Sequence, residues 1–346
     1  MKRNTILTLS AIIAVVLLLI AANSFLDTYL LRILNLCAIY TILGLSMNLI
    51  NGFTGLFSLG HAGFMAVGAY VTALFTMPIA TKEMNFFLAP LVSPLDKFVL
   101  PFLPSLIMAG LFSAFIAFLI GAPVLRLKGD YLAIATLGFG EIIRVVFTNT
   151  QNLTNGALGL KSIPLTTNIW WSFGLTFVTI VVLISLINSS YGRAFKAIRE
   201  DEIAAESMGI YLFKHKVWSF MIGAFFAGIG GGLLSNLIGA IDPLMFRFTT
   251  TYNILLIIVL GGMGSITGTV ISAFIITTAQ EALRFLDEAM IPGIPALPGL
   301  RMVVFSILLM VVVLFFRTGL MGTREFSWDK LLGMFNKKPL AKGGNK

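Results

Sequence analysis

The sequence predicts an all-α protein that crosses a membrane many times. Of the 346 residues, 58% are hydrophobic and only 11% are charged, with a mean hydropathy of +0.95, well outside the usual composition of soluble domains. Several stretches also exceed the roughly 18 apolar residues that mark a candidate bilayer span. Four of them contain no Lys, Arg, Asp or Glu: 5–26, 99–121, 169–187 and 217–241.

We expect about eight full transmembrane helices, beginning with an uncleaved one. Lys2 and Arg3 precede an apolar run that could imitate a signal peptide, but the number of spans that follow favours a retained first helix. Cys37 is the single cysteine, so we expect a buried apolar group and no intramolecular disulfide. The expected spans run near 5–26, 30–50, 56–77, 99–121, 131–148, 169–188, 217–241 and 300–316.

Residues 252–279 do not fit a single span because Gly261, Gly262 and Gly264 interrupt them. Each glycine weakens a helix by roughly 1 kcal/mol relative to alanine. We therefore expect a broken pair of half-helices, either re-entrant or two short crossings. A broken helix is tolerated at membrane depth only where protein or a water-filled cavity shields its backbone. The break is thus a candidate lining of a pathway, although close helix packing explains the glycines equally well.

A second glycine-rich stretch, 48–70, places polar side chains among its glycines. Its Gly55-x-x-Ser58 pattern recurs as Gly262-x-x-Ser265, which hints at an internal repeat, and many transporters bind substrate where repeats meet. A lone intramembrane histidine is more often a packing residue than a ligand, but the polar neighbours favour a pathway role here. The candidate pathway residues are Asn48, Ser58, His61, Gly262 and Ser265.

Glu141 and Arg144 are charged residues inside an expected span. They lie one helical turn apart, at i and i+3, where they can partly neutralise each other. We interpret them as a structural charge pair that fixes the rotation of the helix. A proton relay is the alternative, but an ion-coupled transporter would usually display unpaired intramembrane carboxylates.

The distribution of Lys and Arg predicts which loops are cytoplasmic, since cytoplasmic loops are enriched in both. Residues 189–216 contain five, and the chain from Arg317 onward contains seven against two acids, whereas 148–168 contains only Lys161. We expect both termini and the 189–216 loop to be cytoplasmic, with a single transmembrane domain over 1–320 and a basic tail over 321–346. The basic charge thus reflects topology and contact with an anionic lipid bilayer, not nucleic acid.

Residues 191–210 concentrate charge and helix-forming residues in an otherwise apolar chain. Ser189 and Ser190 are cap candidates for a first short helix, while Asp201 can cap a second one that stops at Gly209. The second helix has a small apolar face, formed by Ile203, Ala204, Ala205 and Met208. Such a helix suits docking into a groove on a partner. A solvated loop would explain the charges but not the double capping.

The sequence lacks the motifs of several enzyme classes. No Gly-Lys dipeptide is present, so the chain has no phosphate-binding loop and cannot hydrolyse ATP by that route. Two histidines and one cysteine provide little basis for a metal site. We therefore expect a protein that is not an enzyme, binds no cofactor or metal, and receives its energy from elsewhere.

Four stretches together resemble a known family. Residues 48–70 (NLINGFTGLFSLGHAGFMAVGAY), 126–144 (RLKGDYLAIATLGFGEIIR), 192–210 (GRAFKAIREDEIAAESMGI) and 258–272 (IVLGGMGSITGTVIS) look like the permease subunits of branched-chain amino acid ABC importers, of the LivM-like type. These motifs span most of the chain from about residue 40 to 280. The resemblance makes 1–320 a permease domain.

Residues 192–210 resemble the cytoplasmic loop by which such permeases contact their ATPase subunits. The general importer pattern is Glu-Ala-Ala-x-x-x-Gly, but here Ile203 stands where the first Glu would be, and Glu202 is one position early. This departure puts the individual contact of Glu202 in doubt. The coupling residues that the resemblance implies are Gly192, Arg193, Arg199, Glu202, Ala204, Ala205 and Gly209.

The resemblance also implies partners and a location. A second related permease, two ATP-binding subunits and an external solute-binding protein would complete the importer, and only the partner subunits would use ATP. The expected function is translocation of branched-chain amino acids across the inner (plasma) membrane of a prokaryote by alternating access. Alternatives remain, since related permeases carry urea or short amides. An ion-coupled secondary transporter would need no partner, and a passive channel would need no nucleotide.

Overall fold

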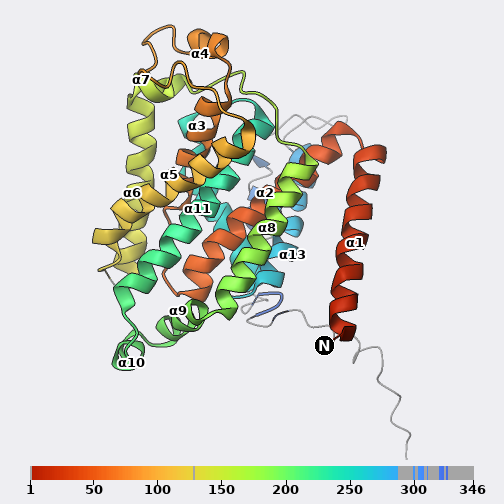
Figure 1. The fold of residues 1–346 in the computed structure, drawn as a ribbon, viewed down its shortest axis with the longest axis vertical. Helices are drawn as coiled ribbons and strands as arrows, with labels where there is room; N and C mark the ends of the chain where they lie inside the picture. The colour runs from red at the N-terminus through yellow and green to blue at the C-terminus, as the bar shows by residue number, and fades with distance from the viewer. Residues whose placement is uncertain are drawn as a thin grey trace, which may run out of the picture.

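A computed structural model describes residues 2–127, 129–286, 299–300, 303–307, 310, 319–322 and 325. Within these residues the protein is helical, and its extended pairing is limited to one antiparallel bridge between Leu160 and Ile241. The long helices run side by side as a bundle (Figure 1). In the described chain, six stretches have the length and composition to cross a membrane: Ile6–Phe25, Thr28–Phe53, Phe102–Val124, Asp130–Asn149, Ile169–Asn188 and Leu212–Ile238. The chain is a multi-pass membrane protein.

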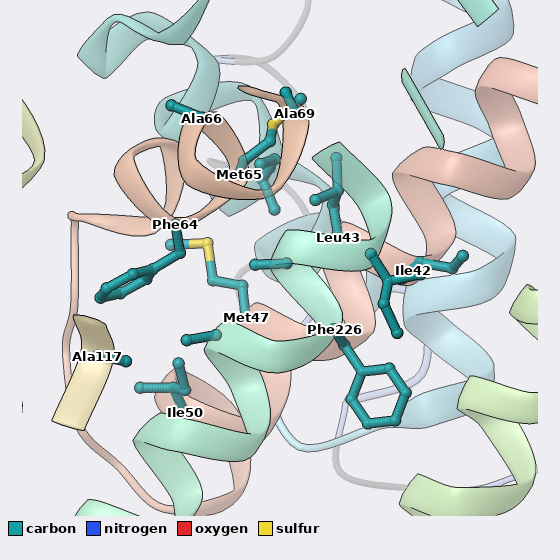
Figure 2. Packing of buried hydrophobic residues seen from close by; sticks show 14 of the residues in the cluster. Ile42, Leu43, Met47, Ile50, Phe64, Met65, Ala66, Ala69, Ala117 and Phe226 are labelled. Carbon is teal, nitrogen blue, oxygen red and sulfur yellow. The ribbon is translucent and has the colours of Figure 1, made fainter. Parts of the chain in front are cut away.

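The centre of the bundle is α11 (Leu212–Ile238), which packs against α2 (Thr28–Asn48), α3 (His61–Thr76) and α5 (Phe102–Val124). A Cβ added at Gly68 would lie 2.1 Å from the Gly228 carbonyl oxygen, so glycines let these backbones approach closely, as is common in membrane bundles. Figure 2 shows the core that these helices share, with labelled side chains Ile42, Leu43, Met47, Ile50, Phe64, Met65, Ala66, Ala69, Ala117 and Phe226.

Three further long helices surround this centre. The helix α6 (Asp130–Asn149) packs against α3, and α8 (Ile169–Asn188) packs against α2. At the edge of the bundle, α1 (Lys2–Phe25) stands apart (Figure 1) and buries Leu19 and Ala22 in a small cluster with Ile169.

The structure confirms helices at the expected spans from 5–26 to 217–241, with one correction. The expected span 56–77 starts late, because α3 begins at His61, and α2 instead continues into a π-helical turn, η1 (Leu49–Phe53). Residues 54–60 are not helical since the side chain of Asn51 bonds both the N–H and the carbonyl of Ser58, each at 3.3 Å, and Gly55 adopts a φ of +75°. The predicted span near 300–316 and tail 321–346 lie largely outside the described residues.

The expected break within 252–279 is confirmed. The chain forms α12 (Phe248–Gly261) and α13 (Ile266–Ala282), which pack against each other and against α2. At 1.5 Å per residue these helices are about 21 and 26 Å long, somewhat short of the roughly 30 Å of a hydrocarbon core.

Short helices lie at both ends of the bundle. At one end are α9 (Ser190–Glu200) and α10 (Glu202–Ser207), and at the other are α4 (Ile79–Asn85) and α7 (Gln151–Thr154) (Figure 1). Single turns complete the described elements: η2 (Gly156–Leu158), η3 (Pro243–Phe246) and η4 (Leu283–Leu286). The start of α1 lies at the same end as α9 and α10 (Figure 1).

Candidate coupling and pathway site

The charged segment folds into the two capped helices that its sequence predicts. The Ser189 hydroxyl accepts a hydrogen bond from the Gly192 N–H at 3.5 Å, and α9 follows. The Asp201 carboxylate accepts from the N–H groups of Ile203 and Ala204 at 2.8 and 3.0 Å, which caps α10. After α10, Gly209 has a φ of +84°, the left-handed conformation in which glycine ends helices.

An ion pair fixes how α10 sits on the bundle. Glu202 Oε1 accepts from Lys216 Nζ on α11 at 2.5 Å, and the Lys216 side chain is only 5% exposed. The expected apolar face needs a correction, because Ala205 is buried within the chain while Ile203 and Met208 are 73% and 84% exposed. Ala204 is also exposed. A partner would therefore meet Ile203 and Met208, which we call the α10 apolar pair.

The expected coupling residues of α9 differ in their surroundings. A Cβ at Gly192 would lie 2.1 Å from the carbonyl oxygen of Ile187, so this glycine permits α9 to turn tightly after α8. Arg193 is exposed, and its Nη2 donates to Ser190 Oγ at 2.9 Å within the same helix. Arg199 is different, because its Nη1 donates to the Gly52 carbonyl in η1 at 3.1 Å.

Asn48 joins the two glycine-interrupted segments. Its side-chain carbonyl accepts from the Gly264 N–H at 2.9 Å, and its Nδ2 donates to the Ser265 carbonyl and to Thr269 Oγ1 at 2.9 and 2.8 Å. The Ser265 hydroxyl in turn caps α13 by accepting from the Gly268 N–H at 3.1 Å. All five residues are buried. Asn48 and Ser265, two expected pathway residues, thus lie together.

Gly262 belongs to the same break but faces another segment. It has a φ of +105°, and a Cβ there would lie 2.3 Å from the Gly322 carbonyl oxygen. Close by, the Glu325 carboxylate accepts from the N–H groups of Ile266 and Thr267 at 2.6 and 3.1 Å and from the Thr267 hydroxyl. This acidic side chain stabilises the N-terminus of α13 through the helix dipole.

Ser58 and His61 make their hydrogen bonds away from Asn48. The backbone of Ser58 bonds Asn51, and His61 Nε2 lies 2.8 Å from Ser46 Oγ on α2. Both side chains are buried, with exposed fractions of 2% and 1%. The five expected pathway residues therefore do not form one cluster: Asn48 and Ser265 lie together, whereas Gly262, Ser58 and His61 have other partners.

A cavity of about 750 Å³ opens beside the break. Its walls come from α8, α9 and α13, with charged groups at Lys196, Arg199 and Glu325 and apolar ones that include Ile184, Val270 and Ile271. Gly264 also borders the cavity. Open space therefore reaches the break between α12 and α13 at the end of the bundle where α9 lies.

The two charged residues expected to pair on α6 form an ion pair in the structure. Arg144 Nε donates to Glu141 Oε2 at 2.6 Å, with side-chain exposures of 23% and 34%. The two charges neutralise each other within a 20-residue apolar helix, which makes both tolerable at membrane depth.

Several residues of this site were missed by the sequence reasoning. Thr269 lies one helical turn after Ser265, a spacing that could have indicated it. Gly52, Lys216 and Glu325 had no such spacing to indicate them. Each bonds a residue that is far away in the sequence or at no characteristic spacing from it: Arg199, Glu202 and Thr267.

Comparison with known proteins identifies relatives. A family described as "Branched-chain amino acid transport system / permease component" matches residues 29–314. The high-affinity branched-chain amino acid transport system permease protein LivM of Escherichia coli is 36% identical over 290 residues, covering 74% of this chain and 64% of that protein.

Two further relatives carry similar descriptions. LivM of Salmonella typhimurium is 36% identical over 284 residues, covering 72% of this chain and 62% of the relative. A probable LivM of Methanocaldococcus jannaschii is 25% identical over 319 residues, covering 82% and 90%. The chain thus spans less than two thirds of the length of the first two relatives. No solved structure matches the chain.

Proposed function

This chain belongs to the family of branched-chain amino acid transport permease components, and from this premise we propose that it is the membrane-spanning subunit of an ATP-driven importer. Its substrates are branched-chain amino acids. Two ATP-binding subunits, a second related permease and an external solute-binding protein complete the assembly. This chain binds no cofactor, and ATP is used by the partner subunits.

The α10 apolar pair is the observation that carries the coupling role. Ile203 and Met208 project from a short capped helix that the Glu202–Lys216 pair ties to α11. An exposed apolar anchor on a fixed helix is typical of helix-in-groove recognition, and anchors in the centre of an interface contribute most of its binding energy. The proposed coupling loop is 189–216, with Gly192, Arg193, Arg199, Glu202, Ala204, Ala205 and Gly209 as its residues.

The proposed orientation places both termini and the coupling loop in the cytoplasm, in the plasma (inner) membrane of a prokaryote. The common end of α9, α10 and the start of α1 (Figure 1) supports this arrangement, as does the enrichment of Lys and Arg there. The proposed permease domain, 1–320, has about eight full spans plus the α12–α13 pair, followed by a basic tail, 321–346. Asn48, Ser58, His61, Gly262 and Ser265 border the proposed route.

The test is reconstitution of the purified complex in proteoliposomes. We expect the chain to co-purify with an ATP-binding subunit and to support ATP-dependent uptake of labelled leucine. Replacing both Ile203 and Met208 with Asp should abolish co-purification, because it would force charges into a desolvated groove, while Glu206→Gln on an exposed position serves as the control.

Other outcomes would separate the alternatives. Uptake of urea but not leucine would move the substrate to short amides. Leucine uptake by the chain alone, without ATP, would refute the importer subunit and favour a self-contained transporter or channel.

A further inference from the structure

We propose that Arg199 transmits movement of the coupling loop to both glycine-interrupted segments, acting as a positioning residue of the transport cycle. This inference rests on the proposed function, because the ATP-binding subunits supply the movement. It assigns this role to Arg199 alone among the side chains of α9.

The first contact of Arg199 is with η1. Its Nη1 donates to the Gly52 carbonyl at 3.1 Å, and a Cβ at Gly55 would lie 2.9 Å from Arg199 Cγ and 3.1 Å from Arg199 Cα. The backbone of α9 thus lies directly against the segment that follows η1. Only glycine leaves room for this approach.

The second contact is with the break between α12 and α13. A Cβ at Gly264 would lie 2.8 Å from Arg199 Nη1, and the same position would lie 3.3 Å from the Gly52 carbonyl oxygen. One guanidinium nitrogen therefore sits where η1 and the α12–α13 break meet. Asn48 fastens these two segments to each other through the Gly264 N–H, so a displacement of Arg199 acts on both.

The guanidinium binds two partners at once. Glu200 Oε1 accepts from Arg199 Nε and Nη2 at 3.1 and 2.5 Å, which leaves Nη1 directed at Gly52. Arginine offers five donors in a rigid planar fork, so it can bind Glu200 and the Gly52 carbonyl together. A lysine has one flexible ammonium group and cannot reproduce this fork.

The position of Arg199 on α9 suits transmission. The helix is anchored on the bundle by Phe195 and Ile198, which are 0% and 2% exposed. Arg199 lies in the last turn of α9, two residues before the Asp201 cap of α10. A force applied to the α10 apolar pair therefore reaches Arg199 through one short capped junction.

The experiment compares Arg199→Gln and Arg199→Lys with Arg247→Gln in the reconstituted complex. Arg247 is the control, since it is an exposed arginine outside the proposed coupling loop and the proposed route. Uptake and ATP hydrolysis are measured together. We expect Arg199→Gln to lower the leucine taken up per ATP by about tenfold, a typical size for coupling between sites, with the ATP-binding subunits still bound. Arg247→Gln should leave this ratio unchanged.

Arg199→Lys keeps the positive charge but loses the fork, and it should lower the same ratio. If Arg199→Gln fails to accumulate, Arg199→Lys carries the test. An unchanged ratio in Arg199→Lys, or loss of the ATP-binding subunits from Arg199 variants, would overturn the proposal. A wild-type complex without any ATP-binding subunit would instead refute the proposed function and leave Arg199 without a movement to transmit.

Discussion

Asn48 makes the hydrogen bonds that join the end of α2 to the break between α12 and α13. The site requires one acceptor for the Gly264 N–H and donors for the Ser265 carbonyl and Thr269 Oγ1. An asparagine amide offers both a carbonyl and an NH₂ group, whereas a carboxylate only accepts and a hydroxyl is too short to bridge three partners. The residue type therefore follows from the backbone geometry of the break.

We predict that Asn48→Ala destabilises the protein by on the order of 1–3 kcal/mol, because the buried Gly264 N–H loses its acceptor. The measurement is the midpoint of thermal unfolding in detergent. Asn149→Ala is the control, since the Asn149 side chain is exposed and bonds only Val145 of its own helix. Equal midpoints for the two variants would contradict the role assigned to Asn48.

A second prediction concerns the ion pair between α10 and α11. Glu202→Gln should destabilise the protein by on the order of 1–3 kcal/mol, because it leaves the nearly buried Lys216 ammonium without its counter-charge. The double variant Glu202→Gln, Lys216→Met should recover much of this loss. Thermal unfolding of both variants forms the measurement. A double variant that is no more stable than the single one would contradict the unpaired Lys216 charge as the cause of the loss.

At the scale of elements, two glycines with left-handed φ values can be compared directly. Gly55 and Gly209 have φ values of +75° and +84°, but a Cβ at Gly209 meets nothing within 4 Å while one at Gly55 meets Arg199. We predict that Gly209→Ala costs about 1–2 kcal/mol from conformation alone, and Gly55→Ala costs roughly 1–3 kcal/mol more through overpacking. Similar unfolding midpoints would contradict the close packing of α9 on residues 54–60.

The elements predicted well from sequence are those set by local chemistry. Asp201 caps α10 through N–H groups two and three residues away, and such spacing is visible in the chain. The late start of α3 was missed because the apolar run 56–77 fits a span, whereas the Asn51 side chain, five residues upstream, decides the path of residues 54–60.

The candidate site was predictable only in part, because its contacts join residues that are far apart in the sequence. Glycine and polar residues marked 48–70 and 261–265 as unusual segments, but the bond from Asn48 to Ser265 joins residues 217 positions apart. The bond from Arg199 to Gly52 spans 147 positions. No local pattern encodes such pairings. The burial of Ala205 was missed because its place depends on how α10 lies against α11.

At the scale of the whole molecule, the proposed orientation predicts which loops an external reagent can reach. We expect a membrane-impermeant maleimide to label Lys161→Cys in intact cells and to leave Ser207→Cys unlabelled until the membrane is opened. Both positions are exposed, and the two loops lie at opposite ends of the bundle (Figure 1). The single native cysteine, Cys37, is 1% exposed and gives little background. External labelling of the Ser207→Cys variant in intact cells would contradict the proposed orientation.

The detached position of α1 has a consequence for biogenesis. Leu31 and Leu34 of α2, which pack against the α1 cluster, follow directly in the chain, whereas Ile169 of α8 is encoded far downstream. At about 5–20 residues per second, the roughly 150 residues between Ala22 and Ile169 take on the order of 10–30 s to synthesise. During that time Ile169 cannot contact α1, which has the highest hydropathy of the six span candidates in the described chain. The ribosome thus completes α1 well before it makes the α8 residue against which α1 finally packs.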